Sequence, residues 1–141
     1  MNDELKARIK AVMYECWWDG IAADISNNDY GSTLKILDEI RHRLCAITPN
    51  RGDMHTKIME NIDVDHMDSM IKHDAISGEY IHSVVNYIVS QIKEYGTVAD
   101  EPWNEVWREK VNTRLINKEP LSKFFPYFFS EAFHRLEKVE E

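Results

Sequence analysis

The stretch SGEYIHSVVNYIVSQIKEYG, residues 77–96, decides the fold class. Its apolar side chains recur every three or four residues, which places them on one face of an α-helix. They are Ile81, Val84, Val85, Ile88, Val89 and Ile92. Ser77 is a favourable N-cap residue, and Gly96 suits the position just past a helix C-terminus. The stretch therefore predicts one amphipathic helix with a single buried face.

The sequence on both sides of this helix repeats the same spacing. Six further helices are expected, over about residues 5–25, 32–47, 54–59, 67–71, 103–115 and 126–139. The helix over 103–115 is expected to follow Pro102, because proline is favourable in the first turn of a helix, and the last helix is expected to start near Pro126. No segment shows the sustained alternation of a β-strand. We predict an all-α fold, a single compact domain of about six or seven helices over residues 1–141.

Composition restricts the classes of function. The 141 residues are 43% hydrophobic and 30% charged, with a formal net charge of −8. This acidic balance argues against a general nucleic-acid binder and against docking on an anionic membrane. The uncharged run between Glu79 and Lys93 is shorter than the roughly 20 residues of a membrane span. Two cysteines outside any CxxC pair, and an N-terminus unlike a signal peptide, favour a cytoplasmic protein.

Two Glu-x-x-His steps are the most enzyme-like feature. Glu39 with His42 and Glu79 with His82 have the spacing used in di-iron carboxylate bundles. At about 100° per residue, however, these side chains lie off the apolar stripes of their helices, so they cannot share an interior metal. The sequence also lacks a nucleophile elbow and a phosphate-binding glycine loop. We expect a non-enzymatic protein without catalytic residues, metal or cofactor, and a metal-binding helical enzyme is the remote alternative.

An aromatic cluster near the C-terminus is the first candidate for partner binding. The run Phe124-Phe125-Pro126-Tyr127-Phe128-Phe129 carries rings on more sides than one helix face can bury. Small helical domains need aromatic volume, which favours a plug in the core. The alternative is an exposed patch that includes Phe124, Phe125 and Phe128 and binds a partner.

A locally basic helix is the second candidate. Arg108, Lys110, Arg114 and Lys118 stand close together in an otherwise acidic chain. A solvated helix face is the default explanation for such a run. The alternative is a docking site for an acidic partner.

Several positions, taken in order, match a known family pattern. They are Trp18-Asp19, Asp24-Ile25, Tyr30, Leu34-x-x-Leu37-x-Glu39-Ile40-x-x-x-Leu44-x-x-x-x-Pro49, Ile58-x-x-x-Ile62-Asp63-x-x-x-Met67, His73-Asp74-Ala75-Ile76 and Tyr87-Ile88-Val89. In this order and spacing, residues 17–101 resemble the T-complex protein 11 family. The family's Cys-Ala-Pro-Val-Arg-Asp-Glu segment corresponds to residues 95–101, where Val98, Asp100 and Glu101 match and Ala99 replaces the arginine.

The resemblance implies a helical, non-enzymatic regulator that acts through protein–protein contacts and is linked to cAMP and protein kinase A signalling. Residues 102–141 are expected to form a helical extension without a match, in a short or truncated member of the family. We expect protein partners, including components of the protein kinase A pathway. The alternative is a self-associating structural protein, cellular or viral, since the aromatic cluster and the Trp17-Trp18 pair are residue types that anchor interfaces.

Overall fold

The computed structural model describes residues 3–140, apart from the side chains of residues 11, 13 and 14. This part of the chain is helical almost throughout and contains no strand, which confirms the all-α prediction. Its elements are α1 (Asp3–Ser26), α2 (Gly31–Ile47), α3 (Gly52–Asn61), α4 (Val64–Lys72), α5 (Gly78–Tyr95), the 3-10 turn η1 (Val98–Asp100), α6 (Glu101–Ile116) and α7 (Leu121–Glu140). None of these helices is long and apolar enough to cross a membrane.

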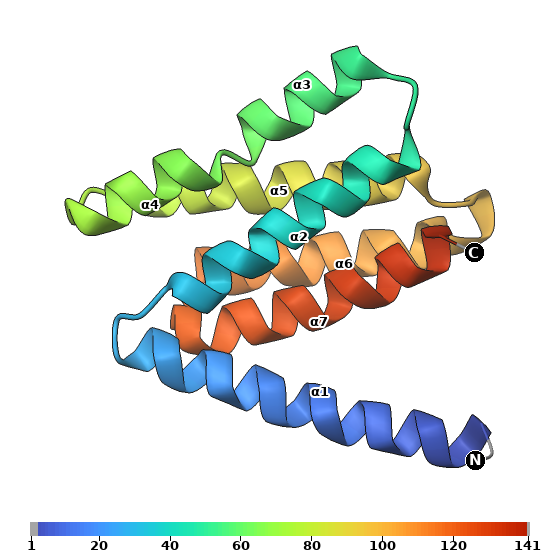
Figure 1. Cartoon of the computed structure of the whole chain (residues 1–141), viewed down its shortest axis with the longest axis horizontal. Helices are drawn as coiled ribbons and strands as arrows, with labels where there is room; N and C mark the ends of the chain where they lie inside the picture. The colour runs from blue at the N-terminus through green and yellow to red at the C-terminus, as the bar shows by residue number, and fades with distance from the viewer. Residues whose placement is uncertain (1–2, 141) are drawn as a thin grey trace.

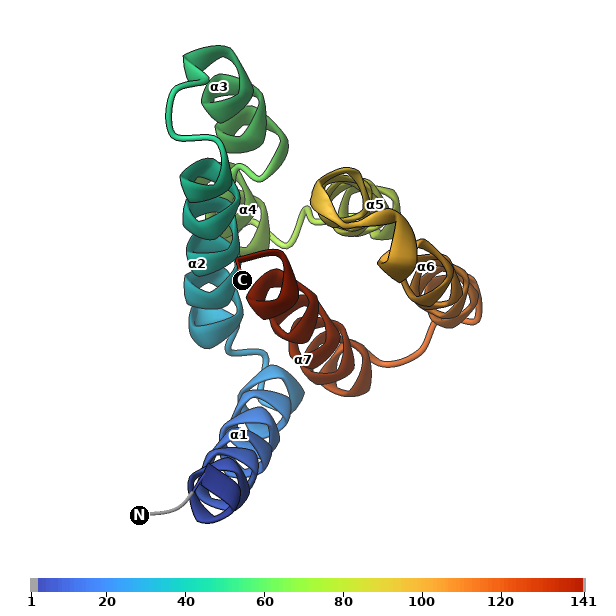
Figure 2. The same cartoon turned by 90° about the vertical axis from the view of Figure 1, so that its right-hand side faces the viewer.

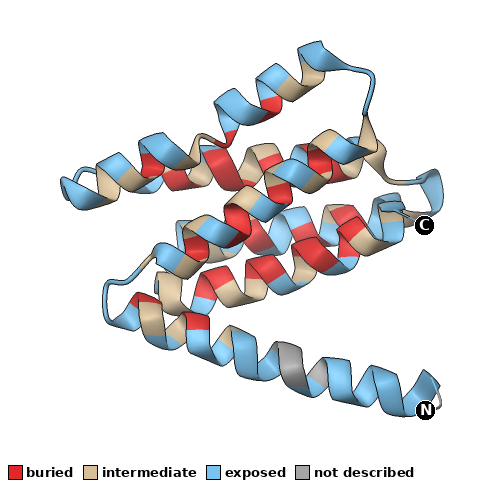
Figure 3. Cartoon of the chain, viewed as in Figure 1, coloured by how far each residue is buried: buried red, intermediate tan, exposed pale blue. Residues whose placement is uncertain are grey.

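Helix α7 is the centre of the fold (Figures 1 and 2). It contacts α1, α2, α5 and α6, while α3 and α4 pack along α2 at the outer edge. Helices α1 and α7 run in opposite directions, and α1 forms one border of the molecule. Most buried residues in Figure 3 lie on α2, α5 and α7, the helices that surround the core.

Local capping signals act as expected. The Ser77 side chain accepts a hydrogen bond from the Tyr80 amide at 3.1 Å at the start of α5. Asp63 caps α4 in the same way, accepting from the His66 amide at 3.0 Å. Gly96 follows α5 directly, and its lack of a side chain matters for packing. A Cβ there would lie 2.9 Å from Asn104 Nδ2, so a side chain at this position would displace the Asn104 amide of α6.

Helix α7 starts earlier than predicted. It begins at Leu121 and includes Pro126 in its interior, where proline removes one backbone hydrogen bond at a cost of about 3 kcal/mol. Phe124 and Phe125, which precede it, are 0% and 3% exposed. Burying each phenylalanine stabilises the fold by about 1.5–3 kcal/mol. This burial offsets the proline, so tertiary packing extends the helix toward its N-terminus.

Candidate functional site

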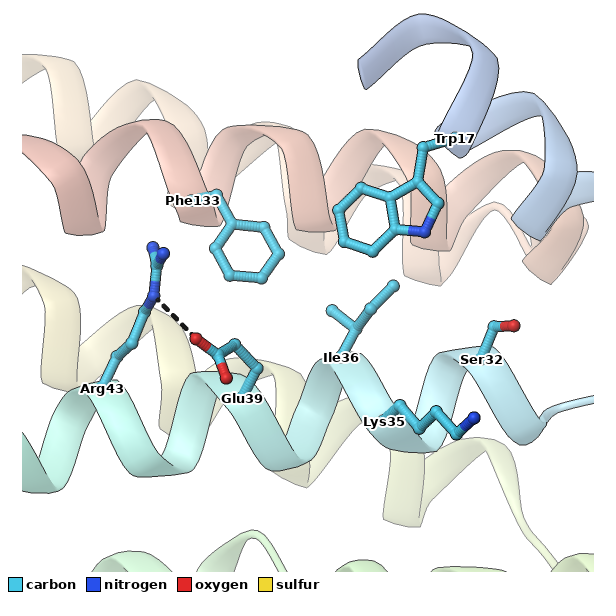
Figure 4. Close-up of a pocket in the computed structure, with 7 residues that line it drawn as sticks. All are labelled: Trp17, Ser32, Lys35, Ile36, Glu39, Arg43 and Phe133. Atoms are coloured by element: carbon cyan, nitrogen blue, oxygen red, sulfur yellow. Dashed lines mark hydrogen bonds and ion pairs between the residues drawn. The ribbon is translucent and has the colours of Figure 1, made fainter. Parts of the chain in front are cut away.

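A groove opens between α1, α2 and α7 (Figure 4). It encloses about 540 Å³, within the range of roughly 300–1,000 Å³ that is usual for binding pockets. Its lining residues are Trp17 of α1, Phe133 of α7, and Ser32, Lys35, Ile36, Glu39 and Arg43 of α2. The groove therefore joins the N-terminal and C-terminal helices, which are far apart in the sequence.

The α2 side of the groove follows helical periodicity. Residues 32, 36, 39 and 43 recur at intervals of three or four and so share one helix face. Ile36 is 3% exposed and belongs to the core, whereas Lys35 and Glu39 are exposed. The groove thus lies where the apolar stripe of α2 meets solvent.

Aromatic rings form the opposite wall. The ring centroid of Trp17 lies 4.7 Å from that of Trp18, in a stacked arrangement, and 6.5 Å from that of Phe133. Phe133 is only 8% exposed, but Trp17 remains 45% exposed. Tryptophan is enriched among the residues that contribute most to protein interfaces. Trp17 is therefore the side chain of this groove best suited to anchor a partner.

The polar rim of the groove has a net positive character. Arg43 Nε donates a hydrogen bond to Glu39 Oε1 at 3.2 Å, and the guanidinium lies 5.0 Å from the Phe133 ring centroid. Arg43 Nη1 is buried and has no hydrogen-bond partner among the described residues. No described carboxylate pairs with Lys35 either. The rim can therefore accept an acidic group, at Lys35 first.

The aromatic cluster predicted from the sequence is not part of any surface patch. Phe124 and Phe128 are 0% exposed and Phe125 is 3% exposed. Phe128 stacks on Trp107 of α6 at 5.6 Å and on Phe124 at 5.7 Å between ring centroids. The core interpretation is thus confirmed and the exposed-patch alternative is wrong. The reason is that α7 contacts helices on several sides, so more than one of its faces is buried.

The basic helix does not form one surface. Arg108 is bound by Glu105, and its hydrogen bonds, with those of Lys93, lower the pKa of the Glu105 carboxyl to about 2. Arg114 turns toward α7, where its guanidinium carbon lies 3.6 Å from the Tyr127 ring centroid.

The remaining two basic candidates lie on different elements, Lys110 within α6 and Lys118 in the connection from α6 to α7. Lys110 is exposed on α6. Lys118 has a left-handed backbone, with φ of 55°, and lines a different groove of about 550 Å³. That groove is mainly apolar and is bordered by the start of α5 and the connection from α6 to α7.

The two Glu-x-x-His steps are used in separate local contacts. Glu39 binds Arg43, while His42 Nδ1 lies 2.7 Å from the Asp38 carbonyl oxygen. His82 Nε2 lies 2.7 Å from Asn112 Oδ1 on α6. Among residues 3–140, excluding the side chains not described, no group of three or more His, Cys, Asp or Glu could hold a metal ion.

A buried arginine is the polar feature that the sequence patterns miss. Arg135 of α7 is 3% exposed, and its guanidinium carbon lies 3.9 Å from the Trp103 ring centroid and 4.5 Å from that of Trp107. It donates hydrogen bonds to Asn104 Oδ1 at 3.0 Å and to Glu131 Oε2 at 2.5 Å. Burial lowers the pKa of this guanidinium, which stays charged because arginine titrates far above neutral pH. Arg135 therefore clamps α7 to α6.

Comparison with known proteins adds a family match. The family model of T-complex protein 11 matches residues 1–117 of the sequence, a span that includes the whole of α6. This span includes residues 102–117, which the sequence patterns left without a match. No solved structure matches the chain. The matched family is not a known enzyme family, and a non-enzymatic helical protein is consistent with it.

Proposed function

Because this chain belongs to the T-complex protein 11 family, we propose that it is a helical regulator that binds a protein partner in the cAMP and protein kinase A pathway. The groove between α1, α2 and α7 is the docking site in this proposal. No chemical step is required of it, since regulation by binding needs only a surface that recognises one partner better than others.

One observation carries the proposal: Trp17 is 45% exposed at the edge of a groove with a cationic rim. A large aromatic side chain that stays partly in water costs free energy, which a partner recovers when it covers the ring. The groove also has an apolar floor at Ile36 and Phe133, which are nearly buried. An apolar floor with a polar rim is the usual anatomy of a protein interface.

The charges of the groove favour an acidic segment of the partner. Lys35 is exposed without an ion pair among the described residues, whereas Arg43 pairs with Glu39 and lies 4.0 Å from Glu140. The only carboxylate in the lining, Glu39, already binds Arg43. A partner segment with an apolar side chain next to a carboxylate would cover the apolar floor of the groove and pair with Lys35 at its rim.

The basic residues of α6 contribute less in this proposal. Arg108 and Arg114 are occupied by Glu105 and Glu119 within the chain, so a partner would have to displace these carboxylates. Lys110 and Lys118 remain secondary candidates for docking.

The test is direct binding of the purified chain to the regulatory and catalytic subunits of protein kinase A, with and without cAMP, by surface plasmon resonance. We expect binding to one subunit and a loss of at least about tenfold in affinity for Trp17→Ala and for Lys35→Glu. The matched controls lie on α3, where Met59→Ala removes another exposed apolar side chain and Lys57→Glu reverses another exposed charge.

The two parts of the proposal fail separately. Absence of binding to either subunit at the highest soluble concentration contradicts the kinase assignment. Binding that is weakened equally by the groove variants and by the α3 controls contradicts the assignment of the groove.

A further inference from the structure

The connection from α6 to α7 holds a lysine in a backbone conformation that lysine does not favour. Lys118 has φ of 55°, in the left-handed region. Its amide donates a hydrogen bond to the Leu115 carbonyl oxygen, and the Glu119 amide donates one to the Arg114 carbonyl oxygen, both at 3.1 Å. These two hydrogen bonds form the Schellman motif, whose left-handed position usually holds glycine or asparagine. A lysine there has a steric cost that glycine avoids.

The same motif ends two other helices, with other residues at its left-handed position. Asn28 follows α1 with φ of 60°, and Asp74 follows α4 with φ of 52°. Their amides donate to the Ile25 and Ile71 carbonyl oxygens at 2.9 and 3.1 Å. Asparagine and aspartate are among the residues that adopt this conformation most readily. Of the described residues with positive φ, Lys118 is thus the one whose type the turn does not explain.

The helix dipole does not explain the lysine either. A cation near the C-terminal end of α6 is favourable, because the last carbonyl groups carry partial negative charge. Arg114 already supplies a cation in the last turn of α6. A further cation would act equally well at a neighbouring position without a left-handed backbone. The surroundings of the Lys118 side chain are therefore the better explanation.

This side chain lines the mainly apolar groove of about 550 Å³ described above. The groove lies where α5 and α7 begin and α6 ends, on one side of the molecule (Figure 1). Ile81, 7% exposed, forms its floor together with the half-buried Leu115 and Leu121, and Ile116 is 71% exposed at its edge. The groove thus combines an apolar floor with an ammonium group at its rim.

The charges around the groove favour a ligand with one negative charge. Glu119 pairs with Arg114 at 3.3 Å, whereas no ion pair of Lys118 occurs among the described residues. A carboxylate can therefore bind the Lys118 ammonium without displacing a group of the chain. Glu79 also lines the groove and is exposed. Its charge disfavours a second negative charge on the ligand, so a carboxylate fits better than a phosphate.

From these observations we propose that the groove binds a small amphipathic carboxylate. Its apolar body lies on Ile81, Leu115 and Leu121, and its carboxylate pairs with the Lys118 ammonium. The volume is within the range of roughly 300–1,000 Å³ that is usual for small-molecule sites. The ten lining residues are fewer than the roughly 20–30 that each side of a stable protein interface contributes, which favours a small molecule.

This site is separate from the docking groove between α1, α2 and α7. The two grooves share no lining residue. The carboxylate site therefore stands or falls independently of the proposed function.

The first experiment uses octanoate as the probe, below the concentration at which it forms micelles. Binding is followed by the amide chemical shifts in NMR spectra of the isotope-labelled chain. We expect the shifts to concentrate at residues 76–82 and 115–121, and octanol, with the same apolar chain and no charge, to bind several-fold more weakly. Absence of these shifts would overturn the proposal. Equal binding of octanol would also overturn it, because the groove would then be only an adsorbing apolar surface.

The second experiment separates ligand binding from folding. Lys118→Gly should lower the affinity for octanoate about threefold to tenfold, because the ion pair is lost. The midpoint of its urea unfolding should stay the same or rise, since glycine adopts the left-handed backbone without strain. Lys118→Arg keeps the charge and should retain the binding. The matched control is Asn28→Gly, the same backbone substitution at the end of α1, which should leave the affinity unchanged.

Two results would contradict the role of Lys118. Equal affinities of Lys118→Gly and Asn28→Gly would show that the ammonium does not contact the ligand. A lower urea midpoint for Lys118→Gly would show that the lysine stabilises the turn itself. Glu79→Gln gives an independent check, because removal of this negative charge should strengthen octanoate binding about twofold or more. Unchanged or weaker binding by Glu79→Gln would overturn the placement of the carboxylate at this rim.

Discussion

Replacing Arg135 with alanine should destabilise the protein by about 3–4 kcal/mol. The guanidinium is 3% exposed and lies between the rings of Trp103 and Trp107. A desolvated cation–π contact contributes about 2 kcal/mol. The hydrogen bond to Asn104 contributes about 1–1.5 kcal/mol more, and its loss leaves a buried amide oxygen without a donor. The pair with Glu131 adds little, because that carboxylate is 36% exposed and water can replace the arginine.

Arg114→Ala is the matched control for this prediction. Arg114 also stacks on an aromatic ring, that of Tyr127, and also pairs with a carboxylate, that of Glu119. Its side chain is 38% exposed, however, so its loss should cost only about 0.5–1 kcal/mol. Urea unfolding followed by circular dichroism measures both free energies. Equal losses in free energy of unfolding for the two variants, or a loss below about 1 kcal/mol for Arg135→Ala, would show that burial does not strengthen the contacts of Arg135.

Two further predictions concern ionisation. The folded pKa of Glu105, about 2, lies below its ordinary value of 4.5 because of its hydrogen bonds with Arg108 and Lys93, so its stabilising effect is present above pH 4.5. The difference in free energy of unfolding between the unmodified chain and Glu105→Gln should therefore shrink as the pH falls from 4.5 to about 2. Urea unfolding at a series of pH values measures this difference. A difference that stays constant over this range would contradict the prediction. Burial raises the pKa of the half-buried Cys45 thiol, whereas Cys16 is exposed. Labelling with a chromogenic disulfide reagent should give a fast phase that Cys16→Ser abolishes and a slower phase from Cys45, and two equal rates would refute this order.

The fold could be predicted where local chemistry determines it. The α5 stretch carries its own cap at Ser77, its own apolar stripe and a stop at Gly96, and all three appear in the structure. The start of α7 could not be predicted in this way. Pro126 is a local signal for a helix start, but the burial of Phe124 and Phe125 depends on helices that are distant in the sequence.

The candidate site was less predictable than the fold, for the same reason. Arg135 sits in a helical pattern where arginine normally indicates a solvated position, and only its neighbours Trp103 and Trp107 make it a buried clamp. Lys35 and Arg43 belong to no motif. They become a site only because α1 and α7 place Trp17 and Phe133 opposite them, an arrangement that no spacing within α2 encodes.

The positions of α1 and α7 explain why an exposed aromatic side chain lies on α1, whereas the phenylalanines of α7 are buried. Helix α7 contacts four helices, so its phenylalanines are covered on several sides and contribute to stability. Helix α1 lies at the border, so its Ile21 and Ile25 are buried while Trp17 stays 45% exposed. Substitutions on these two helices should consequently differ in kind. Changes to the buried α7 aromatics should lower the free energy of unfolding strongly. Trp17→Ala should lower it less, because Trp17 is 45% exposed, and should mainly weaken binding of the partner.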